Sequence, residues 1–235
     1  MSEFINNREY RQKRLKELIK ELHDGASVAE VKAAFAELTD GISAVEIAEI
    51  EQALVNEGMP VEEIQRLCDV HAEVFKGSIE DIHKCDACNV SDFEEGHPVD
   101  TFKKENRAIE KLLDEIEIFL DAYTSYPESD QLNNLKMRLE KISSIDKHYK
   151  RKENLIFPYM EKYNITAPPK VMWGVDDEIR ASIKEALSFL NEERPDVSLI
   201  ESKVKETMTK IRDMIFKEEE IMFPMVLETF SEQEW

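Results

Sequence analysis

Apolar residues recur at helical spacing along nearly the whole chain, and no stretch shows the strict alternation of a strand. In the second half, the helical spacing runs through four long stretches: residues 97–124, 130–163, 171–192 and 198–229. The connections between them are short and contain Pro127, Pro168, Pro169 or Pro195, and short connections favour antiparallel neighbours. The pattern therefore predicts an all-α protein in which residues 97–235 form an antiparallel up-down four-helix bundle.

A small helical domain is expected before the bundle, over residues 1–83. Its apolar stretches are shorter, and Gly25, Gly41 and Gly58 follow them at the positions where helices commonly end. Residues 84–96 have no helical spacing and contain several Asp and Glu with Asn, Ser and Gly. We interpret them as a linker between the two domains.

Polar side chains interrupt the apolar stripe of each bundle helix. These side chains belong to Asn106, His148, Lys152, Asp176 and Glu218. In an up-down bundle their positions lie at one level, so we expect one polar layer, which also includes Met214, at one end of the core. Burying such groups without partners costs several kcal/mol. The side chains must therefore either satisfy one another or bind a cofactor.

The second and fourth helices of the predicted bundle end in similar segments, DKHYKRKENLIFP at 146–158 and DMIFKEEEIMFP at 213–224. Residues four apart lie on one face of a helix, so both segments present polar groups in the same register. The matched pairs, counted back from the final proline, are His148 with Met214, Lys152 with Glu218, and Glu153 with Glu219.

The charge of the chain excludes several partners. Fifty-one acidic residues against 31 basic ones give a formal net charge of -20, which repels nucleic acid and anionic membranes. No run of about 18 uncharged apolar residues predicts a membrane span, and no apolar stretch follows the basic amino terminus as in a secretory signal. We expect a cytoplasmic protein that binds neither nucleic acid nor a membrane.

Several segments together resemble the hemerythrin-like, or HHE cation-binding, family, in the arrangement where a helical domain of unknown function precedes the bundle and a PAS sensor domain often follows. The segments are LVNEGMPVEEIQRLCDVHAEVF, GHPVDTFKKEN, HYKRKENLIFP, MWGVDDEIR and FKEEEIMFPMVLETFSEQEW. The resemblance implies a four-helix bundle that holds a non-haem di-iron centre with histidines and carboxylates. Such centres bind dioxygen or nitric oxide, sense iron or redox state, or repair iron-sulfur centres.

The ligand positions that the resemblance implies are only partly kept. The family's single histidines fall on Asn106 and Asp176, and its two His-Glu pairs fall on His148 with Lys152 and on Met214 with Glu218. Only His148 and Glu218 keep the expected residue type, and an ammonium at Lys152 opposes a second metal ion. The candidate metal ligands are then His148, Glu218, Glu153, Glu219 and Asp176.

Two other interpretations of the polar layer stay open. In the first, His148 and Met214 on facing helices are the axial ligands of a haem, as in some bundle cytochromes, with His97 and His71 close by. In the second, Lys152 pairs with a carboxylate, and His148 and Asn106 complete a hydrogen-bonded cluster that holds no cofactor.

The three cysteines are too few for a disulfide framework. Their pattern suggests a structural zinc site instead, because Cys68 and His71 are followed by the pair Cys85 and Cys88. The alternative is a buried Cys68 and a dithiol that binds no metal.

No nucleophile with an orienting base and no glycine-rich phosphate loop occurs in the chain, so an enzyme is not favoured. The first hypothesis is a non-enzymatic iron- or haem-binding sensor of redox state or of O2 or NO, which signals to an output domain or a partner protein. The second is a di-iron protein that binds or scavenges O2 or NO, or repairs iron-sulfur centres. The third is a bundle without a cofactor that acts as a protein interaction module.

Overall fold

The structure is a computed structural model that describes residues 96–235 continuously. Of the preceding part it describes residues 10, 13–14, 16–18, 20–21, 24–26, 31, 52–53, 56–58 and 60. The described residues form helices, turns and short connections without any strand, which confirms the all-α prediction. His71 and the predicted zinc ligands Cys68, Cys85 and Cys88 lie outside the described residues, so the zinc site stays a prediction.

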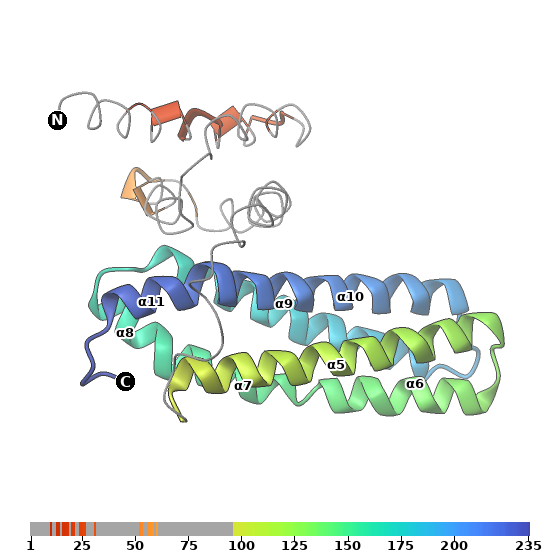
Figure 1. The fold of residues 1–235 in the computed structure, drawn as a ribbon. Helices are drawn as coiled ribbons and strands as arrows, with labels where there is room; N and C mark the ends of the chain where they lie inside the picture. The colour runs from red at the N-terminus through yellow and green to blue at the C-terminus, as the bar shows by residue number, and fades with distance from the viewer. Residues whose placement is uncertain are drawn as a thin grey trace.

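Residues 96–235 form a bundle of four rods (Figure 1). The first is α5 (Pro98–Ser125) and the third is α9 (Ala167–Leu190). The second rod consists of α6 (Ser129–Ile142), α7 (Ile145–Arg151), the π-helix η2 (Lys152–Ile156) and α8 (Phe157–Lys162). The fourth consists of α10 (Val197–Lys217), the π-helix η3 (Glu218–Met222) and α11 (Phe223–Thr229).

The four rods pack as a ring. Consecutive rods contact each other, and the fourth rod closes the ring against the first. Helix α5 lies against α6 and α10, and α9 lies against the same two helices on the other side. This arrangement confirms the predicted up-down bundle, because only antiparallel neighbours can be joined by such short connections. Within the described part of the chain, no helix combines the length and the apolar character that crossing a bilayer demands.

Two predicted helix boundaries were wrong. Helix α9 begins at Ala167 rather than 171, because Pro168 and Pro169 lie in its first turn, where the missing N–H groups cost no hydrogen bond. The single helix predicted over 130–163 is interrupted after Ile142. There the Ser143 hydroxyl donates to the Leu139 carbonyl oxygen at 3.1 Å, a local bond that competes with helix continuation.

The core is one apolar cluster contributed by all four rods. Leu113, Ile116, Ile179 and Ile211 are among its fully buried members, and full burial of such a side chain stabilises the fold by about 1.5–3 kcal/mol.

The chain after α11 folds back over the end of the bundle where α5 begins. Glu234 accepts a hydrogen bond from the Tyr163 hydroxyl at 2.6 Å and pairs with Lys162. The Trp235 ring lies 4.7 Å from the His97 ring and 5.1 Å from the Phe230 ring. These contacts tie the start of α5 and the ends of α8 and α11 together.

Candidate functional site

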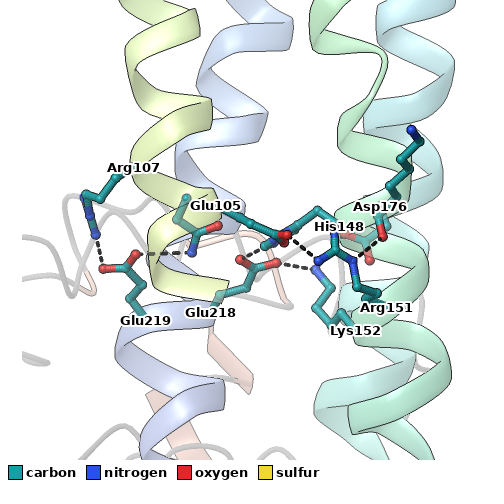
Figure 2. Close-up of polar contacts among 10 residues, drawn as sticks. Glu105, Arg107, His148, Arg151, Lys152, Asp176, Glu218 and Glu219 are labelled. Carbon is teal, nitrogen blue, oxygen red and sulfur yellow. Dashed lines mark hydrogen bonds and ion pairs between the residues drawn. The ribbon is translucent and has the colours of Figure 1, made fainter. Parts of the chain in front are cut away.

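A buried polar layer crosses the bundle at the level where the two π-helices begin (Figure 2). One residue from each rod is completely buried there: Asn106 of α5, Lys152 of η2, Asp176 of α9 and Glu218 of η3. His148 of α7 lies beside them with 3% exposure. The structure therefore brings together the five polar residues that the sequence places at one level, whereas Met214, which was also expected there, is a member of the apolar core cluster.

Both π-helices begin at a residue of this layer. In η2 the Phe157 N–H donates to the Lys152 carbonyl, and in η3 the Phe223 N–H donates to the Glu218 carbonyl, so both bonds span five residues. Pro158 and Pro224 follow directly. A proline inside a helix clashes with the carbonyl four residues earlier, and the wider π turn accommodates it. The repeated aromatic-proline step was the sequence signal for these segments, although only plain α-helices were predicted.

Lys152 occupies the centre of the layer. Its Nζ atom donates to Asp176 Oδ1 at 2.9 Å and to Glu218 Oε1 at 2.6 Å. The ammonium also lies 4.5 Å from the centroid of the Tyr149 ring, a distance that favours a cation–π interaction. Burial lowers the pKa of Lys152, but Glu218 and Asp176 outweigh that effect and the net shift is upward. The side chain is therefore held as an ammonium between Glu218 and Asp176.

His148 is held between two further carboxylate oxygens. Its Nε2 lies 3.0 Å from Glu218 Oε2, and its Nδ1 lies 2.8 Å from Glu105 Oε2. Burial lowers the pKa of His148, but the charge and hydrogen bond of Glu218, with help from Glu105, raise it overall. An imidazolium that donates from both nitrogens satisfies this geometry. It has no lone pair left for iron.

Glu105 was not predicted as part of the site. It lies one residue before Asn106, off the apolar stripe of α5, and its side chain is 26% exposed. It reaches His148 along the seam between α5 and α7 and also pairs with Arg151. The only sequence signal for Glu105 was that it adjoins Asn106. Helical spacing by itself assigns a position off the apolar stripe to the surface.

The two acidic partners of Lys152 differ in protonation. Burial raises the pKa of Glu218, but the opposing effects of Lys152 and then His148 are larger, and the net result is a pKa lowered from 4.5 to about 2. Burial raises the pKa of Asp176 to about 7, and the single ammonium only partly opposes that rise. Asp176 Oδ2 and Asn106 Oδ1 are buried without a hydrogen-bond partner. Glu218 is therefore the ionised centre of the layer, and Asp176 is the group that exchanges a proton near neutrality.

Two predicted metal ligands lie outside the centre, on opposite flanks. Glu153 Oε1 lies 2.8 Å from Arg180 Nη1 on α9. Glu219 accepts from Asn106 Nδ2 at 3.2 Å and pairs with Arg107 on α5 (Figure 2). Glu153 and Glu219, which occupy matched positions in the two similar segments, therefore do not face the same site. Each side chain contacts a different neighbouring helix.

Three of the residues predicted for haem are described by the structure, and each contacts other protein groups, whereas His71 lies outside the described residues. Met214 is completely buried in the apolar core cluster. His97 begins α5 as its N-cap, where its Nδ1 accepts from the Val99 N–H at 3.1 Å. The ring of His148 is packed against Phe102, at 5.1 Å between centroids, in addition to its two carboxylate contacts. This arrangement gives the axial-ligand interpretation no support.

A di-iron centre does not fit these residues either. Among the residues that the structure describes, no three His, Cys, Asp or Glu side chains are grouped as a metal ion requires. The physical reason is the Lys152 ammonium, which takes up an oxygen of both Asp176 and Glu218 and repels a divalent ion. Glu218 and His148 are the two positions that keep the residue type of the family's ligands. Both nitrogens of His148 already face carboxylates, so this ligand position is also taken up by protein contacts.

Two family models match this chain. The model described as "Hemerythrin HHE cation binding domain" matches residues 97–226, and the model described as "Family of unknown function (DUF438)" matches residues 15–81. No curated protein matches the chain. The first match covers the bundle with its polar layer.

Proposed function

This chain belongs to the hemerythrin HHE cation binding domain family, and from that premise we propose that it is a non-enzymatic interaction module whose resident cation is the ammonium of Lys152. The family binds cations, typically iron. In this member the carboxylates that face the centre of the bundle bind a cation that the chain itself supplies.

One observation carries the proposal: Lys152 Nζ lies 2.9 Å from Asp176 Oδ1 and 2.6 Å from Glu218 Oε1, and all three side chains are fully buried. A buried carboxylate needs a positive partner. In a metal-binding bundle the metal ion would meet this need, whereas here Lys152 and His148 meet it from neighbouring turns of one rod.

The burial of the layer supports a role without catalysis. Lys152, Asp176 and Glu218 are 0% exposed, so a substrate could contact them only after the helices separate. The raised pKa of Lys152 keeps the amine protonated and therefore not nucleophilic. What remains available for function is the outer surface of the bundle and its contacts with the amino-terminal domain. A sensor role, O2 or NO as ligands, an output partner and a cytoplasmic location stay predictions.

Metal analysis after iron loading tests the proposal. Protein purified anaerobically, incubated with excess ferrous iron and desalted should retain far less than one iron per chain. Lys152→Glu restores the carboxylate that the family has at this position. This variant should be less stable than the wild type without metal, take up iron, and regain stability when iron is added.

Lys150→Glu is the matched control, because it makes the same charge change on an exposed side chain two residues away. It should behave as the wild type does in iron retention. Stoichiometric iron in the wild-type protein would overturn the proposal. A titration with hemin tests the haem interpretation separately: a Soret shift that His148→Ala and Met214→Ala both abolish would also overturn it.

A further inference from the structure

The first turn of α9 lacks a cap of its own. The initial N–H groups of a helix have no partner within the helix and need an acceptor. Thr166 is the N-cap residue of α9, yet its side chain makes no capping hydrogen bond. Pro168 and Pro169 have no N–H group to satisfy. The donors at this helix start are therefore concentrated in the backbone of Thr166 and Ala167.

Gln52, from the part of the chain that precedes the bundle, supplies the missing acceptor. Its side-chain Oε1 accepts from the Ala167 N–H at 2.7 Å and from the Thr166 N–H at 3.0 Å. The Thr166 hydroxyl donates to the same oxygen at 3.2 Å. One amide oxygen thus takes up three donors, where the partial positive charge of a helix start favours an acceptor.

The same turn is covered although it lies at an end of the bundle. Ala167, Pro168 and Pro169 are all buried. Ala167 is completely buried but is not a member of the apolar cluster that forms the bundle core. Burial outside that core, together with the bonds to Gln52, indicates that this turn is a contact surface and not a free helix end.

We infer that the first turn of α9 is the docking surface for the amino-terminal domain, and that Gln52 is the removable cap through which this domain holds α9. Gln52 lies within residues 15–81, which match the family of unknown function. The surface fits a neutral or anionic side-chain acceptor and excludes a cation. This inference deepens the proposed function, on which it rests, because it identifies the partner of the interaction module as a domain of the same chain.

The position of the surface gives the contact a route to the polar layer. Asp176, which binds the Lys152 ammonium, follows Ala167 by nine residues on the same helix. That separation is about 13 Å along the axis of a continuous helix. A domain that holds or releases the start of α9 therefore acts on the helix that contributes one carboxylate of the layer.

Hydrogen exchange of the 235-residue chain tests the inference at the Thr166 and Ala167 amides. Gln52→Ala removes the acceptor and should speed exchange of both amides by about tenfold, the equivalent of one hydrogen bond. Gln52→Lys should speed it further, because an ammonium opposes the positive end of the helix. Gln52→Glu keeps an acceptor oxygen and should preserve wild-type protection.

Asn133→Ala is the control, since it truncates an exposed amide side chain on α6 and should leave both amides unchanged. The expected order is Glu and Gln slowest, then Ala, then Lys. Equal exchange in all four Gln52 forms would overturn the inference. Equal acceleration by Gln52→Ala and Gln52→Glu would also overturn it, since the acceptor would then have no role. Neither outcome depends on iron content, so this inference and the metal-free proposal can fail separately.

Discussion

Lys152 shows how one side chain changes the chemistry that a bundle can hold. The two rods that end in similar segments place Lys152 and Glu218 at matched positions, each at the first residue of a π-helix. A carboxylate at both positions would leave the layer short of positive charge and ready for metal ions. With an ammonium at one of them, the Nζ atom binds the opposite Glu218 at 2.6 Å. Removing one partner of such a buried pair typically costs about 3–5 kcal/mol, because the other charge is stranded.

Asp176 governs the pH dependence of stability on the acidic side of neutrality. Its pKa is raised from 3.8 to about 7 by burial. Between these values the folded protein holds a proton that the unfolded chain has lost, so the free energy of unfolding falls as the pH rises through this window. Each unit of pKa difference corresponds to about 1.4 kcal/mol. His148 changes the free energy of unfolding in the same direction. Its pKa is raised in the folded protein, so its stabilising contribution is lost as the pH rises through the folded-state pKa.

Glu218 acts in the opposite direction at lower pH. Its pKa is lowered from 4.5 to about 2, so its contribution is complete above 4.5 and is lost as the pH falls towards 2. We therefore expect maximal stability at mildly acidic pH. Urea unfolding followed by circular dichroism should show stability falling from about pH 5 to pH 7. Asp176→Asn should flatten this slope, whereas Asp177→Asn, the same change on the exposed neighbour, should not. A wild-type stability that rises over this range would contradict the assignment to Asp176.

At the scale of the helices, the rods are held in register by specific polar contacts as well as by apolar packing. The buried hydroxyls of Ser182 on α9 and Thr207 on α10 lie 2.6 Å apart. Thr207 already donates its proton to the Lys203 carbonyl at 2.8 Å. The Ser182 hydroxyl must therefore donate to Thr207, and the pair fixes how α9 slides along α10.

Substitutions in this hydroxyl pair should show non-additive costs. Thr207→Val strands the buried Ser182 donor and should lower the free energy of unfolding by about 1–3 kcal/mol. Adding Ser182→Ala to that variant should recover part of the loss, because the stranded group is removed. Thr209→Val is the control: this threonine makes the same kind of bond, to the Lys205 carbonyl at 3.0 Å, but is exposed. Chemical unfolding of Thr207→Val, Ser182→Ala, the double variant and Thr209→Val measures the effect, and strictly additive losses in the double variant would exclude the pairing described.

At the scale of the whole molecule, the net charge of the chain contrasts with the near balance of charge in the buried layer. The layer is nearly balanced, with Lys152 and His148 facing Glu218, Asp176 and Glu105. The chain as a whole has a formal net charge of -20. The layer therefore accounts for little of the excess negative charge, and negative charges in such excess repel one another and destabilise the compact state.

Screening of this repulsion should stabilise the protein. We expect the melting temperature to rise when sodium chloride is increased from about 0.02 M to about 0.5 M, because the Debye length shortens from roughly 20 Å to under 5 Å. Choline chloride at the same concentrations should give the same rise, since screening does not depend on the identity of the cation. A rise that required micromolar divalent cations, with no response to choline, would show instead that the carboxylates bind metal ions.

The amino-acid sequence by itself determined the helical class, the order of the rods and the five polar residues that interrupt the apolar stripes. The spacing of apolar residues is a local property that survives in any packing, and the positions that break it must meet in an antiparallel bundle. The departure of Lys152 from the family's ligand pattern was visible for the same reason. To recognise it, one needs only the residue type at a known level of the helix.

Only the tertiary structure decided which partners these side chains take. Glu105 reaches His148 from an off-stripe position, Glu153 and Glu219 turn to opposite flanks, and Gln52 caps a helix more than a hundred residues away in sequence. Such contacts depend on the rotation of each helix about its axis and on the reach of long side chains, and the π-helices change that rotation at the layer itself. A periodic pattern predicts the face of the helix on which a residue lies, but it does not predict which neighbouring side chain that residue contacts.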